Sequence, residues 1–136
     1  MQSESIVVHA TYKDIRMPTQ RLRALLLTNH VREEVINLCE LALHELLTNL
    51  VDHAYQGDEN RLIKVNMIYD AARILIETQD TGIPSHVDLD NISMPDPADL
   101  AEGGYGVAII QSLMDEVEYK HENGKNLWKL VKQISN

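Results

Sequence analysis

The sequence offers little that would stabilise a domain by covalent means. Its 136 residues include one cysteine, Cys39, so there is no partner for an intrachain disulfide and no second cysteine at zinc-ligand spacing. Cys39 lies in an apolar helical pattern, which favours a buried structural thiol over a reactive one. Stability must come from a hydrophobic core, and a chain of this length is sufficient to form one. We therefore expect a single domain over residues 1–136.

Long apolar runs and basic charge are also scarce. No run approaches the ~20 apolar residues that a membrane span needs, and the first ten residues carry neither a basic segment nor a signal-peptide core. Lysine and arginine number 12 against 21 aspartate and glutamate residues, a net charge of −9, which repels phosphate backbones. These features argue against membrane insertion, secretion and direct nucleic-acid binding. We expect a cytoplasmic protein that binds a protein partner or a metal-bound nucleotide.

Helical and β-rich patterns alternate along the chain without a linker that would separate two domains. The patterns predict strands at 5–10, 62–69, 73–78, 116–120 and 127–133, and helices at 18–29, 31–54 and 106–114. The longest helix contains neither glycine nor proline, and Gly57 is expected to end it. This order predicts an α+β fold, a two-layer α/β sandwich with helices on one face of a mostly antiparallel mixed sheet.

One connection is longer than a compact domain ordinarily needs. A polar, proline-bearing stretch runs from Asp80 to Gly104, between the hairpin that ends near Thr78 and the last predicted helix. Loops of that length without structure of their own usually have a function. The stretch therefore predicts a mobile lid at about 84–104.

Two polar residues interrupt the apolar pattern of the long helix. Glu45 and Asn49 are four positions apart, so they lie on one helix face, with Asp52 close beside them. Burying a carboxylate or an amide without a partner is costly, so this placement indicates a ligand, a metal or a compensating network. The alternative is that these residues form the solvated edge of the helix.

Two glycine-containing motifs follow. Asp80-Thr81-Gly82 comes directly after a predicted strand, where the carboxylate could accept the exocyclic amine of adenine and the glycine would leave room for the base. Gly103, Gly104 and Gly106 open the last helix, and backbone N–H groups at a helix N-terminus bind phosphate. Each motif alone is weak, because Asp and Gly also form plain turns.

The ordered combination of these motifs is more specific. A polar pair on a helix, a strand followed by D-x-G, a long lid and G-x-G at a helix start resemble the ATPase superfamily of gyrase, heat-shock chaperones, histidine kinases and mismatch-repair ATPases. Within it, the segments ELLTNLVDHAY, EGGYG and LMDEVEY resemble the anti-sigma-factor serine/threonine kinases of bacterial partner-switching systems. The resemblance covers about Glu33 to Lys132. It implies a histidine kinase-like ATPase domain of the Bergerat type.

The resemblance implies a role for each matching residue. Glu45 matches the general base that would act on a substrate serine hydroxyl, and Asn49 matches the residue that coordinates Mg²⁺ bridging the phosphates of ATP. Asp80 and Gly82 match the adenine-reading residues. The phosphate loop would be formed by Gly103, Gly104 and Gly106.

Three residues depart from the superfamily pattern. Pro84 stands where many members have a second glycine, and it would stiffen the turn beside the nucleotide. Asp52 lies where histidine kinases often carry a lysine facing the phosphates, so its negative charge would need Mg²⁺ or distance from the nucleotide. Asn126 stands near a position where many relatives have a threonine close to adenine, and its amide could replace that hydroxyl.

Two functional classes remain open. The first is a protein kinase that binds a sigma factor and phosphorylates a STAS-type anti-anti-sigma protein. The second is a non-catalytic, ATP-gated binding module of the same fold. The resemblance also implies a homodimer that pairs near the first strand, with Ile6 and Val8 or Val7 among its contacts; an unpaired strand edge there would favour pairing.

Overall fold

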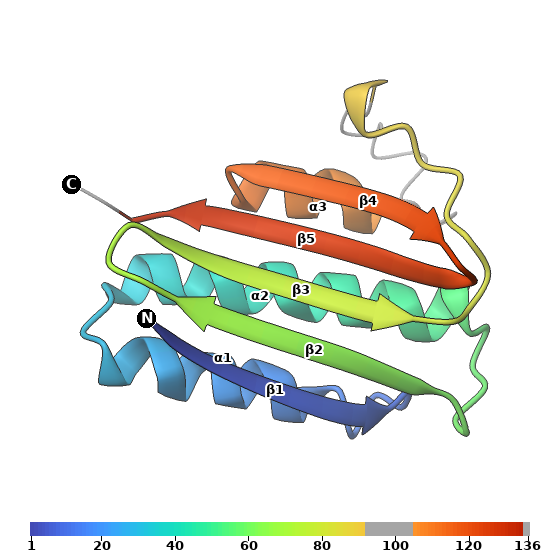
Figure 1. Cartoon of the computed structure of the whole chain (residues 1–136), viewed down its shortest axis with the longest axis horizontal. Helices are drawn as coiled ribbons and strands as arrows, with labels where there is room; N and C mark the ends of the chain where they lie inside the picture. The colour runs from blue at the N-terminus through green and yellow to red at the C-terminus, as the bar shows by residue number, and fades with distance from the viewer. Residues whose placement is uncertain (92–104, 135–136) are drawn as a thin grey trace.

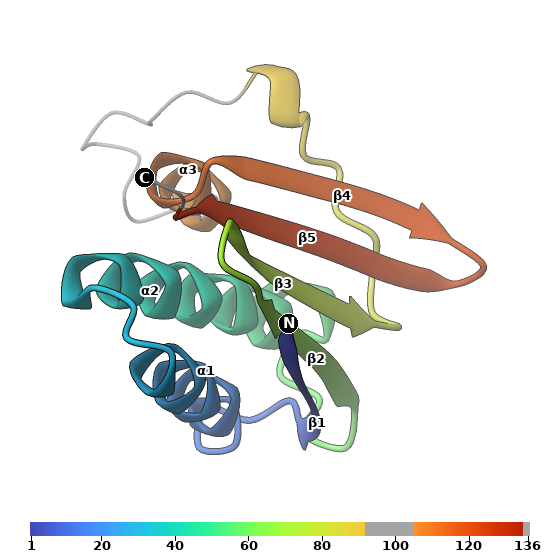
Figure 2. The ribbon, with the colours of Figure 1, turned by 60° about the vertical axis from the view of Figure 1, so that its left-hand side comes forward.

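The computed structural model describes residues 1–91 and 105–134, in which helices cover one face of a single sheet (Figures 1 and 2). The strands are β1 (Gln2–His9), β2 (Leu62–Tyr69), β3 (Arg73–Asp80), β4 (Glu116–Glu122) and β5 (Lys125–Gln133). The helices are α1 (Arg16–Thr28), α2 (Glu33–Asn49), the π-helix η1 (Leu50–Ala54), the 3-10 helix η2 (Leu89–Asn91) and α3 (Tyr105–Leu113). The two-layer α+β sandwich predicted from the sequence is confirmed.

The strand order is β1-β2-β3-β5-β4, and all four pairings are antiparallel. The sheet was expected to be mixed, but the described strands contain no parallel pair. The pairs β2–β3 and β4–β5 are hairpins, and the non-hairpin pairs β1–β2 and β3–β5 are antiparallel as well. The order places the end of β3 beside the start of β5, with Asp80 opposite Asn126. Two segments far apart in the sequence therefore meet at one end of the sheet.

The core lies between the sheet and the helices. Every second residue of β2 and β3 faces the helices and is buried, which gives the alternation expected of a sheet with one covered face. α2 contributes a stripe of buried residues at helical spacing, namely Ile36, Cys39, Ala42, Leu43, Leu46 and Leu47. No helix in the described part of the chain is long and apolar enough to cross a membrane.

The end of the long helix departs from α-helical geometry. The N–H of Tyr55 donates to the carbonyl of Leu50 at 2.9 Å, an i to i−5 hydrogen bond, so one π-turn follows α2. The carbonyl of Ala54 instead accepts the N–H of Ile83 at 2.8 Å. The helical segment ends at Ala54, and two residues with positive φ follow, Gln56 at +50° and Gly57 at +80°. Gly57 therefore lies just past the end of the helix rather than at its last turn. This arrangement ties the chain after β3 to the end of the long helix.

Candidate functional site

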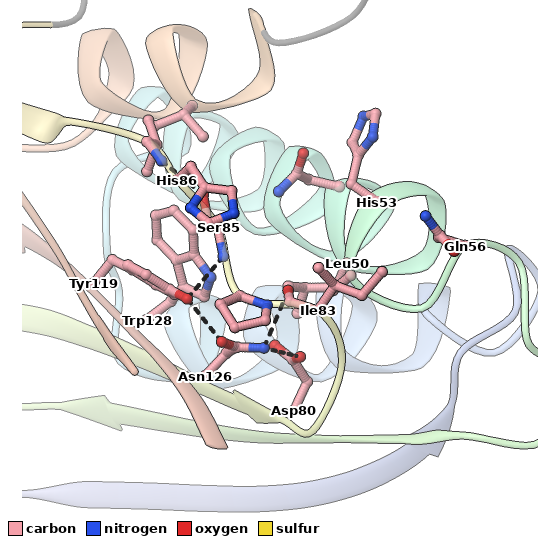
Figure 3. A pocket seen from close by; sticks show the side chains of 15 residues that line it. Leu50, His53, Gln56, Asp80, Ile83, Ser85, His86, Tyr119, Asn126 and Trp128 are labelled. Atoms are coloured by element: carbon pink, nitrogen blue, oxygen red, sulfur yellow. Dashed lines mark hydrogen bonds between the residues drawn. The ribbon is translucent and has the colours of Figure 1, made fainter. Parts of the chain in front are cut away.

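A cleft of about 310 Å³ opens where the end of the long helix, the end of β3 and the β4–β5 hairpin meet (Figure 3). Its apolar lining includes Leu50, Ile83, Val107 and Trp128, and its polar lining includes Asn49, Asp80 and Asn126. Trp128 is 2% exposed and lies against Tyr119, with ring centroids 4.6 Å apart. An apolar cleft with a few convergent polar groups is typical of a small-molecule site.

Asp80 is the polar group whose environment is most unusual. The residue is 1% exposed, and its Oδ1 accepts the N–H of Gly82 at 2.9 Å and Asn126 Nδ2 at 2.7 Å. Its Oδ2 is buried and has no hydrogen-bond partner among the described residues. Burial raises the pKa of the carboxyl group, against the opposing effect of the hydrogen bonds from Asn126 and Gly82. A buried acceptor therefore remains available for a donor in the cleft.

Gly82 is required for a different reason than the sequence suggested. A Cβ at this position would lie 2.3 Å from the carbonyl oxygen of Ala54, a backbone atom that cannot move aside without breaking its hydrogen bond to Ile83. The glycine thus allows the turn after β3 to pack against the end of the long helix. This contact, rather than only space for a base, fixes Asp80 relative to α2.

A second set of contacts holds the same turn from its outer side. The hydroxyl of Tyr55 accepts the N–H of Thr81 at 2.8 Å and donates to the carbonyl of Leu62 at 2.6 Å. Arg61 donates to the carbonyl and hydroxyl oxygens of Thr81 at 2.9 and 2.8 Å, and its guanidinium lies over the Tyr55 ring. Asp80 is therefore positioned by fixed backbone on both sides, a requirement for selective recognition.

Asn49 and Gly106 lie on the opposite side of the cleft from the turn. Asn49 lines the cleft, and a Cβ at Gly106 would lie 3.9 Å from the Asn49 side chain and 4.0 Å from the carbonyl of Glu45. The start of α3 therefore packs against the last turn of α2. Glu45 is half-buried one helical turn before Asn49 and is not among the residues that line the cleft.

The structure thus brings Asn49, Asp80, Gly82 and Gly106 together and places Glu45 beside them. Gly103 and Gly104, the other two glycines of the predicted phosphate loop, lie outside the described residues. Asp52 does not line the cleft. Its carboxylate accepts the hydroxyl of the exposed Tyr12, because Asp52 lies in the π-turn, where the 100° advance per residue assumed from the sequence does not hold.

Pro84 lines the cleft beside the turn, so its predicted proximity to the ligand site is consistent with the structure. Asn126, which the sequence placed only near the adenine position, contacts the proposed adenine-reading residue directly, because its amide donates to the carboxylate of Asp80.

Sequence reasoning missed three residues of this site. Tyr119 and His121 of β4 contact the Asn126 side chain, and the backbone of Ser85 contacts Tyr119. The signal that could have found them is the hairpin register around Asn123-Gly124, which places His121 opposite Asn126 and Tyr119 opposite Trp128. Single positions of β4 carry no motif that would reveal these contacts.

The chain is similar in sequence to bacterial serine-protein kinases. It is 35% identical over 103 residues to serine-protein kinase RsbW of Bacillus pumilus, covering 70% of this chain and 63% of that protein. It is 30% identical over 89 residues to serine-protein kinase RsbW of Halalkalibacterium halodurans, covering 62% of this chain and 55% of that protein. The alignments therefore span less than two thirds of the length of these relatives.

Solved structures with the same fold include the RsbU and RsbW domains of Rv1364c from Mycobacterium tuberculosis, with a TM-score of 0.70 at 19% identity, covering 97% of this chain and 32% of that chain. The SiaB–SiaC complex from Pseudomonas aeruginosa contains a chain with a TM-score of 0.66 at 12% identity, covering 96% of this chain and 89% of that chain. At these identities the likeness shows the fold alone. The model of the histidine kinase-like ATPase domain matches residues 8–132. The chain therefore belongs to the histidine kinase-like ATPase domain family, as the sequence motifs indicated.

Proposed function

We propose that the cleft binds the adenine base of ATP. The observation that carries this proposal is the buried Oδ2 of Asp80 at the cleft wall, which has no hydrogen-bond partner within residues 1–91 and 105–134. A carboxylate oxygen is an acceptor, and the exocyclic amine of adenine is the donor that would satisfy it. Guanine carries an oxygen at the equivalent position, and two acceptors facing each other in a buried site repel. The apolar groups of Leu50, Ile83 and Trp128 fit the faces of a flat base.

The same orientation would carry the phosphates toward Asn49 and the start of α3. Asn49 would hold Mg²⁺ through its amide oxygen, and Gly103, Gly104 and Gly106 would approach the phosphates through their backbone. Among residues 1–91 and 105–134, no cluster of three or more His, Cys, Asp or Glu could hold a metal by itself. Mg²⁺ would therefore take most of its ligands from phosphate and water, and it would neutralise phosphate charge.

We further propose that the chain is a cytoplasmic serine/threonine kinase and an anti-sigma factor in a partner-switching system. The family membership and the similarity to serine-protein kinases RsbW support this proposal. Glu45, half-buried one turn from Asn49, would accept the proton of a substrate serine hydroxyl as general base. The proposed substrate is a STAS-type anti-anti-sigma protein, the second partner is a sigma factor, and the working form is a homodimer.

The test measures nucleotide binding and phosphate transfer separately. Equilibrium titration with Mg-ATP should give saturable binding, and labelled phosphate should enter a STAS-type partner from the same genome. Glu45→Ala should leave nucleotide affinity nearly unchanged and slow transfer by about 10²–10⁴-fold, the usual effect of removing a general base. Folded wild-type protein that shows no saturable binding up to millimolar ATP would refute the nucleotide site.

The alternative function is a non-catalytic module of the same fold whose partner binding depends on ATP. The position of Glu45 outside the cleft lining is compatible with this alternative, since its access to a partner's serine depends on the complex. Tight ATP binding without transfer to any candidate partner, together with an unaltered Glu45→Ala variant, would favour the module over the kinase.

A further inference from the structure

Four residues form a continuous chain of hydrogen bonds that ends on the carboxylate of Asp80 (Figure 3). The N–H of Ser85 donates to the Tyr119 hydroxyl oxygen at 2.9 Å, and that hydroxyl donates to Asn126 Oδ1 at 2.7 Å. Asn126 Nδ2 then donates to Asp80 Oδ1 at 2.7 Å. Every donor points toward the carboxylate, so the bonds polarise one another in the same direction.

The orientation of the Asn126 amide in this chain is determined by its neighbours. Its Nδ2 faces Asp80 Oδ1 and, at 3.0 Å, the carbonyl of Gly82, and both of these atoms are acceptors when Asp80 is ionised. A carbonyl oxygen in that place would be repelled by both. Asn126 Oδ1 must therefore face β4, where it accepts the Tyr119 hydroxyl and lies 2.9 Å from His121 Nδ1, which must carry the proton. The amide has one favourable orientation.

Tyr119 occupies the middle of the chain and is held independently of its hydroxyl. Its ring packs on Trp128 at a centroid distance of 4.6 Å, and β4 pairs the two residues directly. Removing only the hydroxyl oxygen would thus leave the ring in place. Asn126 would lose one of two donors, and the N–H of Ser85 would lose its acceptor. The hydroxyl can therefore be tested without deleting a core side chain.

We propose that Tyr119 is a positioning residue for base recognition: acting through Asn126, it holds Asp80 with its free oxygen toward the base and links that contact to the backbone at Ser85. The inference rests on the proposed binding of adenine nucleotides. A donor on Asp80 Oδ2 holds the carboxylate in the orientation in which Oδ1 accepts from Asn126, and Ser85 lies at the far end of the same chain. An acceptor at that position in the base would repel Oδ2 and turn the carboxylate out of this orientation. By resisting that turn through Asn126, Tyr119 contributes to the choice between the two bases.

The test compares Mg-ADP with Mg-IDP, whose hypoxanthine base carries an oxygen in place of the exocyclic amine. Calorimetric titration of wild type should show tighter binding of ADP. Tyr119→Phe should lower the ratio of the ADP to the IDP affinity by about 3- to 10-fold, the effect of one hydrogen bond. Tyr69→Phe is the matched control, because Tyr69 packs against the core and its hydroxyl bonds no other residue in the described ranges. In Tyr69→Phe the ratio of the ADP to the IDP affinity should stay at the wild-type value.

A double-mutant cycle separates positioning from a general structural effect. In an Asp80→Ala background the carboxylate that Tyr119 positions is absent, so adding Tyr119→Phe should change the ADP to IDP ratio by less than about twofold. Equal weakening of both nucleotides by Tyr119→Phe, or the same change of ratio in both backgrounds, would leave Tyr119 with a packing role only and overturn the proposal.

A measurement on wild type does not depend on the folding of any variant. At equal saturation, ADP should slow hydrogen exchange of the Ser85 amide more than IDP does, because only ADP holds the Asp80 carboxylate in the orientation on which this chain ends. Equal protection by the two nucleotides would overturn the link to Ser85. If wild type binds neither nucleotide, the proposed function fails and this inference fails with it. If wild type binds ADP but Tyr119→Phe leaves the ratio of the ADP to the IDP affinity unchanged, only the inference fails.

Discussion

The space beside Gly82 is closed by the carbonyl oxygen of Ala54, which would lie 2.3 Å from a Cβ at position 82. This carbonyl also accepts the N–H of Ile83 at 2.8 Å. The end of the long helix and the turn that carries Asp80 are therefore in backbone contact, with no side chain between them. The distance between Asn49 and Asp80, one on each side of the cleft, depends on this contact.

Gly82→Ala should consequently destabilise the protein. The added methyl group must displace a backbone carbonyl, so the variant combines overpacking with the loss of the Ile83 hydrogen bond, at a cost of about 2–4 kcal/mol. Urea unfolding followed by circular dichroism measures the change. Gly106→Ala is the control, because its Cβ would meet nothing closer than 3.9 Å and alanine favours a helix. If both variants lose the same stability, the Ala54 contact is not the reason.

Asp80→Asn should exchange the base preference. Oδ1 of the new amide can still accept from Gly82 and Asn126, while its NH₂ group occupies the place of the unpartnered Oδ2 and presents a donor to the cleft. The affinity for ATP should fall by about 10-fold or more, because one hydrogen bond is replaced by two facing donors. The affinity for ITP should fall less than that for ATP, or should rise. Competition against a labelled nucleotide measures both. Equal losses for ATP and ITP would argue that Asp80 does not contact position 6 of the base.

The same substitution should change the pH dependence of the stability of the free protein. Burial raises the folded-state pKa of Asp80, so the folded state binds a proton more readily than the unfolded chain. The free energy of unfolding of wild type, relative to that of Asp80→Asn, therefore falls as pH rises from the ordinary aspartate pKa, about 3.9, through the raised pKa of Asp80 in the folded state. At higher pH it stays at the lower level. The variant should therefore gain stability relative to wild type across this pH range and keep that gain at neutral pH. Urea titrations across this pH range measure the difference, and a pH-independent difference would contradict the prediction.

Asn49→Ala should weaken Mg-ATP binding, unlike Glu45→Ala. If Asn49 holds the metal, its loss should reduce the affinity for Mg-ATP by about 10- to 100-fold. Removing Mg²⁺ with a chelator should weaken wild-type binding strongly and the variant only slightly, because the two changes remove the same interaction. Equal sensitivity of both proteins to the chelator would show that Asn49 acts on the nucleotide in another way.

Association through β1 can be tested at Val7. Within β1, Val8 is buried in the core and Val7 is 56% exposed, so Val7 is the residue of this pair available to a second copy. Wild type should sediment as a homodimer at micromolar concentration, and Val7→Lys should raise the dissociation constant by about tenfold, since edge lysines oppose strand pairing. Glu116→Lys on β4, at the opposite edge, is the charge control. A wild type that is monomeric throughout would remove the homodimer proposal and leave the cleft unaffected.

The sequence by itself determined the elements and most of the residues that could contact a ligand. The long helix, the two hairpins and the D-T-G turn are encoded locally, because apolar periodicity and turn residues act over a few positions. Glu45 and Asn49 share a helix face for the same reason. The predicted helices and strands are accordingly present in the structure, with shifts of a few residues at their ends.

Only the tertiary structure decided how the cleft is completed. Asp80 and Asn126 are 46 positions apart, and their contact depends on β5 pairing with β3, which no local pattern specifies. The π-turn directs the side chain of Asp52 toward Tyr12 and away from the cleft. The carbonyl of Ala54 leaves no room for a side chain at position 82, which explains why a glycine stands there. Tyr119 has no motif of its own and gained a role through strand register alone. Backbone packing and long-range pairing are collective properties of the folded chain, so they determine which polar groups are left without a partner and hence available to a ligand.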